Sequence, residues 1–180
     1  MLNHKEKEKI LSMHSKISIY SPWTDPILFK RIVDELSAPF LDLKIDKVVG
    51  IEARGLIMGG AVAYKIGAGF VLCRKKGNTY QYKYPRNLVF SKSCIDYSGK
   101  RKTLELEKKN KGIAKGDKVL IIDDWFGSGN QGLTAIDLVH RAGGMVIGFG
   151  IMLDDMSEET RLKYSPYNLH SLITRTPPKG

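Results

Sequence analysis

Short apolar runs alternate along this chain with segments whose apolar residues recur at helical spacing. Four runs have the length and residue types of strands: residues 46–51, 68–73, 119–122 and 145–153. The run at 119–122 has the pattern of a strand buried on both faces, and residues 103–107 alternate as a further strand. Four segments carry helical patterns: residues 4–17, 29–41 (interrupted near Pro39), 56–66 and 133–141. This alternation predicts an α/β fold with a doubly wound, mainly parallel sheet.

A chain of 180 residues is long enough for one such domain with a substantial core. We therefore expect a single domain over 1–180, with a small hood built from about 1–35 and 154–174. No apolar run reaches the roughly 18 residues needed to span a bilayer, and the N-terminal residues lack the apolar core of a signal peptide. Cys73 and Cys94 are too few for a disulfide scaffold, and we expect both to lie in strands as small buried thiols. These observations predict a reducing, cytoplasmic setting without membrane contact.

The most informative stretch follows the apolar run at 119–122. Asp123 and Asp124 stand where that strand should end, and a Gly-Ser-Gly-Asn turn over 127–130 leads into the next helix. Ligands of open α/β sheets bind outside the carboxyl ends of the strands. A Gly-rich turn before a helix offers N–H groups and a positive dipole end to a phosphate, while acids suit sugar hydroxyls or Mg²⁺. The stretch predicts a phosphorylated-sugar site; the alternative is an ordinary strand-turn-helix with a polar tip.

Two earlier strands are each followed by a cation and a glycine. Arg54-Gly55 comes after the run at 46–51, and Arg74-Lys75-Lys76-Gly77 comes after the run at 68–73. Cations at neighbouring strand ends favour an anion at that edge of the sheet.

Positive charge is concentrated in one part of the chain. Residues 74–111 hold twelve lysines and arginines and three acids, so this segment carries +9 of the net charge of +10. Such a field attracts polyanions, either a small polyphosphate or a nucleic acid. The alternative is a solvated basic loop.

The motifs resemble those of a known family. Residues 119–132 resemble the ribose-5-phosphate signature of type I phosphoribosyltransferases, with Asn130 and Gln131 in place of the usual Gly and Thr and a bulky Trp125 after the acids. Residues 50–55 and 67–77 resemble the corresponding loops of adenine phosphoribosyltransferase, and residues 169–173 its closing strand. The resemblance spans about residues 20–174.

The resemblance implies a reaction in which phosphoribosyl pyrophosphate and a purine base, adenine, give a nucleoside monophosphate and pyrophosphate. It also implies residue roles. Phosphoribosyl pyrophosphate would be bound by Arg54, Arg74, Lys75, Asp123, Asp124, Gly127, Ser128, Gly129, Asn130 and Gln131. The base would be bound by Leu28, Phe29 and Lys30, although Arg31 replaces the family's usual Asp. Mg²⁺ would be the cofactor, carried mainly by pyrophosphate and ribose oxygens, and the protein would be a homodimer.

The catalytic residues implied by the resemblance are Arg54, Asp96 and Tyr97. Asp96-Tyr97 lies where the family has the Glu-Tyr of its catalytic loop, with Ser98 as an extra residue. Two other functions remain open. One is a transferase with a different base acceptor. The other is a regulator that senses phosphoribosyl pyrophosphate and binds nucleic acid through 74–111; no DNA-reading module is evident, so we expect no nucleic-acid partner.

Overall fold

The computed structural model describes residues 1–12, 22–76, 89–95, 99–107 and 112–175. Asp96 and Tyr97 lie outside these residues, as do the tyrosines of segment 77–88.

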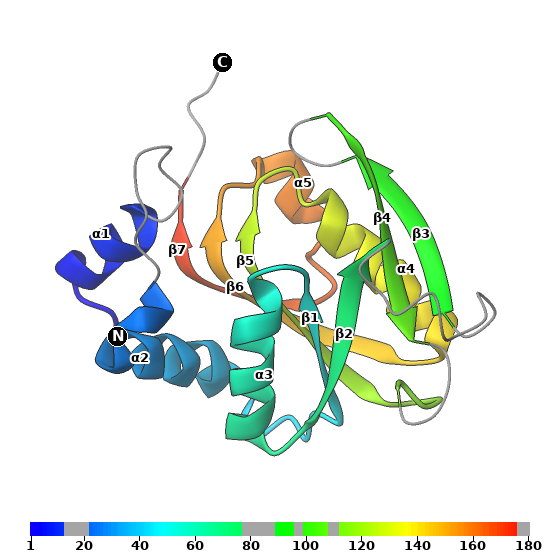
Figure 1. The fold of residues 1–180 in the computed structure, drawn as a ribbon, viewed down its shortest axis with the longest axis horizontal. Coiled ribbons are helices and arrows are strands. Elements are labelled where there is room, and N and C mark those ends of the chain that lie inside the picture. The colour runs from blue at the N-terminus through cyan, green and yellow to red at the C-terminus, as the bar shows by residue number, and fades with distance from the viewer. Residues whose placement is uncertain (13–21, 77–88, 96–98, 108–111, 176–180) are drawn as a thin grey trace.

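Seven strands form one sheet in the order β3-β4-β2-β1-β5-β6-β7 (Figure 1). The strands are β1 (Lys47–Ile51), β2 (Gly69–Lys75), β3 (Val89–Ile95), β4 (Arg101–Glu107), β5 (Lys118–Phe126), β6 (Met145–Asp154) and β7 (Asn168–Thr174). The helices are α1 (His4–Ser12), α2 (Pro26–Ser37), α3 (Gly55–Ile66), α4 (Asn130–Ala142) and α5 (Glu158–Leu162), with short 3₁₀ turns η1 (Pro22–Thr24) and η2 (Ala38–Phe40). Strands β2, β1, β5, β6 and β7 run parallel, which confirms the predicted fold class.

The sheet separates two apolar cores. Alternate residues of the central strands point to opposite faces, so Val48 packs with α2 and α3 while Val49 packs with α4. Tyr164, just after α5, is fully buried in the second core. Helices on both faces cover the strands that run parallel (Figure 1), as a doubly wound sheet requires.

Helix α2 begins three residues earlier than the apolar pattern predicts. The Asp25 side chain accepts hydrogen bonds from the backbone N–H groups of Ile27 and Leu28, and Pro26 occupies the first turn. An N-cap acid followed by proline is a strong helix start. Residues 27–29 are therefore helical, and the predicted interruption is the change from α2 to η2 at Ala38.

Strand β3 confirms the expectation that Cys94 lies in a strand, although its place in the sheet was not predicted. It pairs antiparallel with β4, and β4 pairs antiparallel with β2, so a hairpin extends the parallel sheet at one edge. The carbonyl end of β3 at Ile95 lies near the first turn of α4, where the side-chain amide of Asn130 donates to the Ile95 oxygen at 3.0 Å.

Helix α1 is attached to α2 by charged side chains. Arg31 Nη1 lies 2.5 Å from Glu6 Oε1, and Lys9 Nζ lies 3.1 Å from Asp25 Oδ2. Ile10 is fully buried between these contacts. Arg31, the residue that departs from the resembling family, thus has a structural partner in α1. Within the part of the chain that the structure describes, no helix is both long and apolar enough to cross a membrane.

Candidate active site

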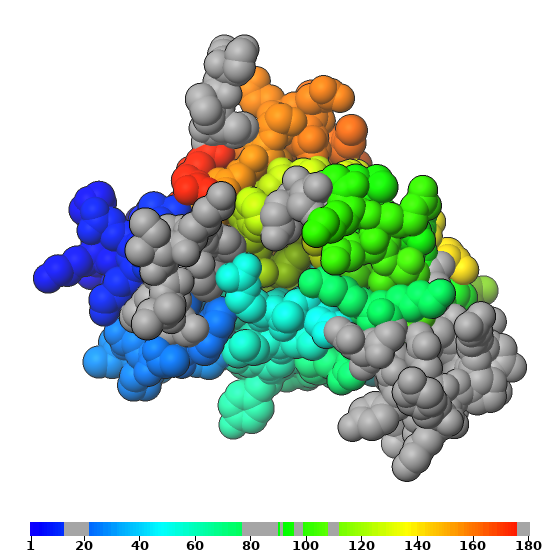
Figure 2. All heavy atoms as spheres, turned by 45° about the horizontal axis from the view of Figure 1, so that its top comes forward, coloured from blue at the N-terminus to red at the C-terminus, as the bar shows by residue number. Residues whose placement is uncertain are grey.

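A polar cleft of about 160 Å³ opens at the carboxyl ends of β1, β2 and β5. Figure 2 shows the segment that follows β1 (cyan) against the segment around the end of β5 (yellow-green). The lining residues are Glu52, Ala53, Arg54, Lys75, Asp123, Asp124, Trp125, Phe126, Gly127, Ser128, Gly129 and Gln131. The cleft lies where parallel α/β sheets bind their ligands.

The loop after β1 places a cation in this cleft because its glycines allow close packing. A Cβ added at Gly55 would lie 2.8 Å from Asp123 Oδ1. The first turn of α3 can therefore approach β5 this closely only because residue 55 is glycine. The Glu52 carboxylate accepts a hydrogen bond from the backbone N–H of Lys75 at 2.7 Å, which joins the ends of β1 and β2. The peptide bond between Glu52 and Ala53 is cis. Because the hydrogen bond between Glu52 and Lys75 holds the two strand ends together, Arg54 and Lys75 line the same cleft.

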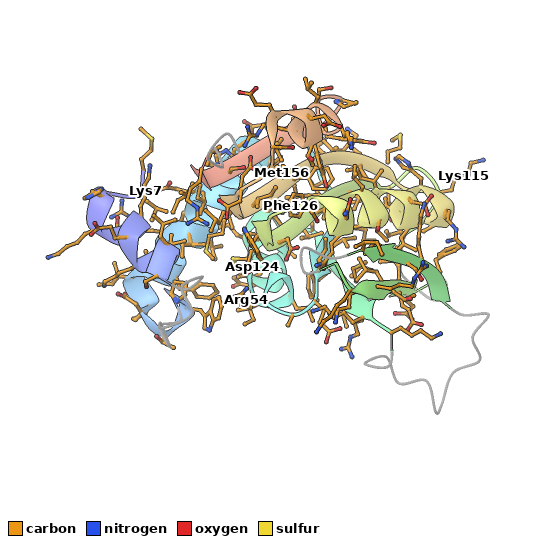
Figure 3. All side chains as sticks on the ribbon, turned by 90° about the horizontal axis from the view of Figure 1, so that it is seen from above. Lys7, Arg54, Lys115, Asp124, Phe126 and Met156 are labelled. Carbon is orange, nitrogen blue, oxygen red and sulfur yellow. The ribbon has the colours of Figure 1, made fainter. Side chains whose placement is uncertain are left out.

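Arg54 and the two acids form the charged centre of the site. Arg54 Nη2 lies 2.7 Å from Asp124 Oδ2, and Figure 3 shows the two side chains next to each other. Asp123 is only 5% exposed, and its Oδ1 accepts from the Asp124 backbone N–H at 2.9 Å. Burial raises the pKa of the Asp123 carboxyl well above its usual range, and the neighbouring Asp124 carboxylate raises it further.

Residues 127–131, named the phosphate turn after the role that the sequence predicts for them, span the connection from β5 to α4 and the first two residues of that helix. Gly129 has a φ of 71°, a left-handed conformation that glycine adopts without strain, and it is the N-cap of α4. The Tyr164 hydroxyl donates to the Gly129 carbonyl oxygen from below. A Cβ added at Gly132 would lie 2.5 Å from both Phe126 Cζ and the Tyr164 oxygen, so the first turn of α4 rests directly on the buried aromatic residues. The buried side chains of Phe126 and Tyr164 thus form the floor of the phosphate turn, the surface on which it packs.

The structure brings together most of the residues expected to bind phosphoribosyl pyrophosphate. Of the ten, eight line the cleft: Arg54, Lys75, Asp123, Asp124, Gly127, Ser128, Gly129 and Gln131. The other two lie beside it. Arg74 lies within β2, opposite Glu105 of β4, and Asn130 contacts β3.

The residues expected to bind the base lie in α2, and none of them is among the residues that line the cleft. Leu28 is 2% exposed and belongs to the core. Phe29 lies in a separate groove with Trp23 and Tyr64, and Lys30 pairs with Asp34 at 2.6 Å. Their role in base binding stays a prediction.

Two residues of the site were not singled out from the sequence, and a third was noted only for its size. Glu52 lies inside the loop motif, which was its only sequence signal. Tyr164 has none, because it reaches Gly129 from 35 residues away. Trp125 stood out only by its size; its indole N–H donates to Asp155 Oδ2 at 2.8 Å, and Asp155 in turn pairs with Arg175.

A doubly wound sheet, a Gly-rich turn after paired acids, and cations on the two neighbouring strand ends define the class of the protein. The family model described as phosphoribosyl transferase domain matches residues 27–177, and the chain belongs to this phosphoribosyltransferase family.

The relatives within the family share a more particular name, adenine phosphoribosyltransferase. The protein of that name from Dinoroseobacter shibae is 36% identical over 154 residues, covering 84% of this chain and 81% of the relative. The one from Rhizobium leguminosarum is 37% identical over 151 residues, covering 83% and 78%.

Solved structures of adenine phosphoribosyltransferases have the same fold. That from Rhodothermus marinus has a TM-score of 0.73 at 30% identity and covers 96% of this chain and 100% of its own. That from Giardia lamblia, solved in complex with 9-deazaadenine, has a TM-score of 0.73 at 32% identity and covers 85% and 82%.

Proposed function

We propose that this enzyme transfers the phosphoribosyl group of phosphoribosyl pyrophosphate to adenine, giving AMP and pyrophosphate. The observation that carries the proposal is the cleft itself, in which two cations, two buried acids and the phosphate turn face one another. This set matches a ligand with a phosphate at one end, a sugar in the middle and a pyrophosphate at the other. The choice of adenine is supported by the relatives of that name.

The arrangement of charge accounts for the reaction. Cleavage at C1′ of the ribose leaves positive charge on the sugar and negative charge on the departing pyrophosphate. Arg54 and Lys75, at the ends of adjacent strands, would stabilise the leaving group. Asp123 and Asp124 would accept hydrogen bonds from the ribose hydroxyls and balance the cationic sugar. The N–H groups of the phosphate turn would bind the 5′-phosphate at the N-terminus of α4.

The acids of the cleft also fit Mg²⁺, provided that the substrate supplies most of its ligands. Among the residues that the structure describes, no group of three or more His, Cys, Asp or Glu side chains could hold a metal, and Asp124 is already paired with Arg54. Pyrophosphate and ribose oxygens would therefore carry the ion beside Asp123 and Asp124. When bound, it would neutralise charge on the leaving group.

Roles for Asp96, Tyr97 and the base-binding residues rest on the resemblance. Asp96 would exchange a proton with the base. Tyr97 would help to exclude water, which would compete with the base as nucleophile. Leu28, Phe29 and Lys30 would contact the base, with Phe29 stacking on it.

A cytoplasmic homodimer is the remaining part of the proposal. Four large apolar side chains of α3 and the adjacent β2 are exposed: Ile57, Tyr64, Phe70 and Leu72. Tyr64 is 91% exposed, and a surface of this kind favours contact with a second copy.

The test is a panel of purine and pyrimidine bases, each supplied with phosphoribosyl pyrophosphate and Mg²⁺, with pyrophosphate release as the readout. Adenine should give a kcat/KM at least about tenfold above any other base, because hydrogen-bonding pockets reject mismatched analogues strongly. A higher value for another base would identify a transferase with a different acceptor. Tight, salt-resistant binding of nucleic acid without any transfer would instead favour the regulator.

A further inference from the structure

We propose that Asn130 is a positioning residue that holds the phosphate turn against strand β3. Asn130 is the first residue of α4 and the last but one of the turn, and its side-chain amide donates to the Ile95 carbonyl oxygen at 3.0 Å. The inference rests on the proposed function, since it concerns how the turn is kept ready for the 5′-phosphate.

The bond to Ile95 is the outer of two attachments of the turn. The inner one is the hydrogen bond from the buried Tyr164 hydroxyl to the Gly129 carbonyl oxygen. The two bonds hold consecutive residues, Gly129 and Asn130, and their partners belong to different parts of the fold. Together they restrain both the position of the turn and its rotation about the axis of α4. Donors that are already oriented need no further ordering when an anion binds.

Ile95 is a well-placed partner because β3 is fixed along α4 at two further points. Lys92 Nζ lies 3.1 Å from Asp137 Oδ1, and the Arg141 guanidinium lies over the Phe90 ring, 5.3 Å from its centroid. Asp137 and Arg141 follow Asn130 by seven and eleven positions, and this spacing places all three residues on one face of the helix. Strand β3 is an edge strand with β4 as its neighbour, so the helix provides the other side of its support.

The attachment is a property of this chain's own sequence. In the signature that residues 119–132 resemble, the position of Asn130 is glycine, which has no side chain to make the bond. Asparagine has a short side chain with few rotamers, so fixing it costs little conformational entropy. The departure from the family pattern therefore replaces a flexible position with a connection between the phosphate turn and the β3–β4 hairpin.

Calorimetric titration with two separate ligands tests this role. Ribose 5-phosphate requires the turn, whereas pyrophosphate requires Arg54 and Lys75 at the opposite end of the cleft. Asn130→Ala should weaken binding of ribose 5-phosphate about five- to tenfold, the scale of one hydrogen bond. Its affinity for pyrophosphate should stay within about twofold of wild type.

Two further variants separate positioning from a general loosening of the edge. Asn130→Gln keeps an amide donor and should recover affinity for ribose 5-phosphate to within about threefold of wild type. Lys92→Met breaks the Lys92–Asp137 pair between β3 and α4 without touching the turn. It should leave pyrophosphate affinity unchanged and weaken ribose 5-phosphate binding by less than about threefold, because the Arg141–Phe90 contact still holds the strand. Circular dichroism melting establishes that each variant is folded.

The outcomes are distinguishable. Unchanged ribose 5-phosphate affinity in Asn130→Ala would overturn the role of Asn130, as would an equal loss in Lys92→Met or a failure of Asn130→Gln to recover. Parallel loss of pyrophosphate affinity would also overturn it, because the effect would then involve the whole cleft. Wild-type protein that binds neither compound would overturn the proposed function, and the role of Asn130 with it.

Discussion

Arg54 and Asp124 form an ion pair with 2.7 Å between Nη2 and Oδ2, although one follows β1 and the other lies in β5. The pair exists because parallel neighbouring strands end at the same edge of the sheet. Figure 3 shows it in the middle of the molecule, far from the surface lysines Lys7 and Lys115. The guanidinium of Arg54 balances the negative charge of Asp124, a residue that is only 7% exposed.

Replacing Arg54 should therefore affect both catalysis and stability. Arg54→Gln removes the cation that we propose stabilises the leaving group, and we expect kcat/KM to fall roughly 10²–10³-fold. It also leaves the Asp124 carboxylate without its cation, which should lower the free energy of unfolding by about 1 kcal/mol, because Arg54 is partly exposed and the pair is screened. Urea unfolding and pyrophosphate release measure the two effects. Lys65→Gln, which breaks an exposed pair with Asp34, is the control and should change neither.

The raised pKa of Asp123 gives a prediction about pH. A carboxyl group whose pKa is higher in the folded state binds more protons there than in the unfolded chain, so its contribution to stability falls as pH rises from about 3.8 through the raised value. Asp123→Asn should therefore melt at a higher temperature than wild type at neutral pH, with the difference shrinking toward pH 3.8. Its transferase activity should fall at least about tenfold, because Asn cannot balance the cationic sugar. A melting temperature at neutral pH equal to or below that of wild type would contradict the assignment.

Two helical glycines make a matched pair for testing the floor of the phosphate turn. A methyl group at Gly132 would collide with Phe126 and Tyr164, whereas at Gly60 the nearest atom is 3.9 Å away. Gly132→Ala should lower the free energy of unfolding by about 1–3 kcal/mol through overpacking. Gly60→Ala should raise it by up to about 1 kcal/mol, since alanine is the better helix former. Equal effects in chemical denaturation would mean that the turn does not rest on this aromatic cluster.

The role of Asp96 can be tested by changing its proton chemistry alone. If Asp96 exchanges a proton with the base, Asp96→Asn should lower kcat roughly 10²–10⁴-fold. Binding of phosphoribosyl pyrophosphate should change little, because other loops hold its anionic groups. Asp96→Glu should keep substantial activity, since it restores the acid of the resembling family. Full activity of Asp96→Asn with adenine would show that the proton goes to solvent.

The parts of the fold that local sequence specifies were predicted, and those that depend on distant contacts were not. The run at 119–122, the paired acids and the glycines of the turn each have a local signature, so strand, turn and helix follow in the predicted order. A strand at Cys94 was expected, but the antiparallel pairing of β3 with β4, and of β4 with β2, was not, because that pairing depends on distant segments. The start of α2 is an exception, because its signal is local: a capping acid and a proline, rather than the apolar pattern, determine its first turn.

The candidate site followed the same rule. The sequence could indicate which residues stand at strand ends, and eight of these meet in the cleft. It could not indicate that Tyr164 supports Gly129 or that Asn130 reaches Ile95, because those partners are 35 residues apart in each case. Both contacts depend on how α4 is packed, which no local pattern encodes.

The position of Trp125 makes the cleft visible to ultraviolet spectroscopy. The chain contains two tryptophans, and Trp23 lies in the groove with Phe29, apart from the cleft. The indole of Trp125 lines the cleft, packs against Gly127 and has its N–H held by Asp155. A Trp23→Phe protein would thus carry a single tryptophan, which lines the candidate site. Its emission would respond to occupancy of the cleft, so each step of substrate arrival and product departure could be timed without a chemical label.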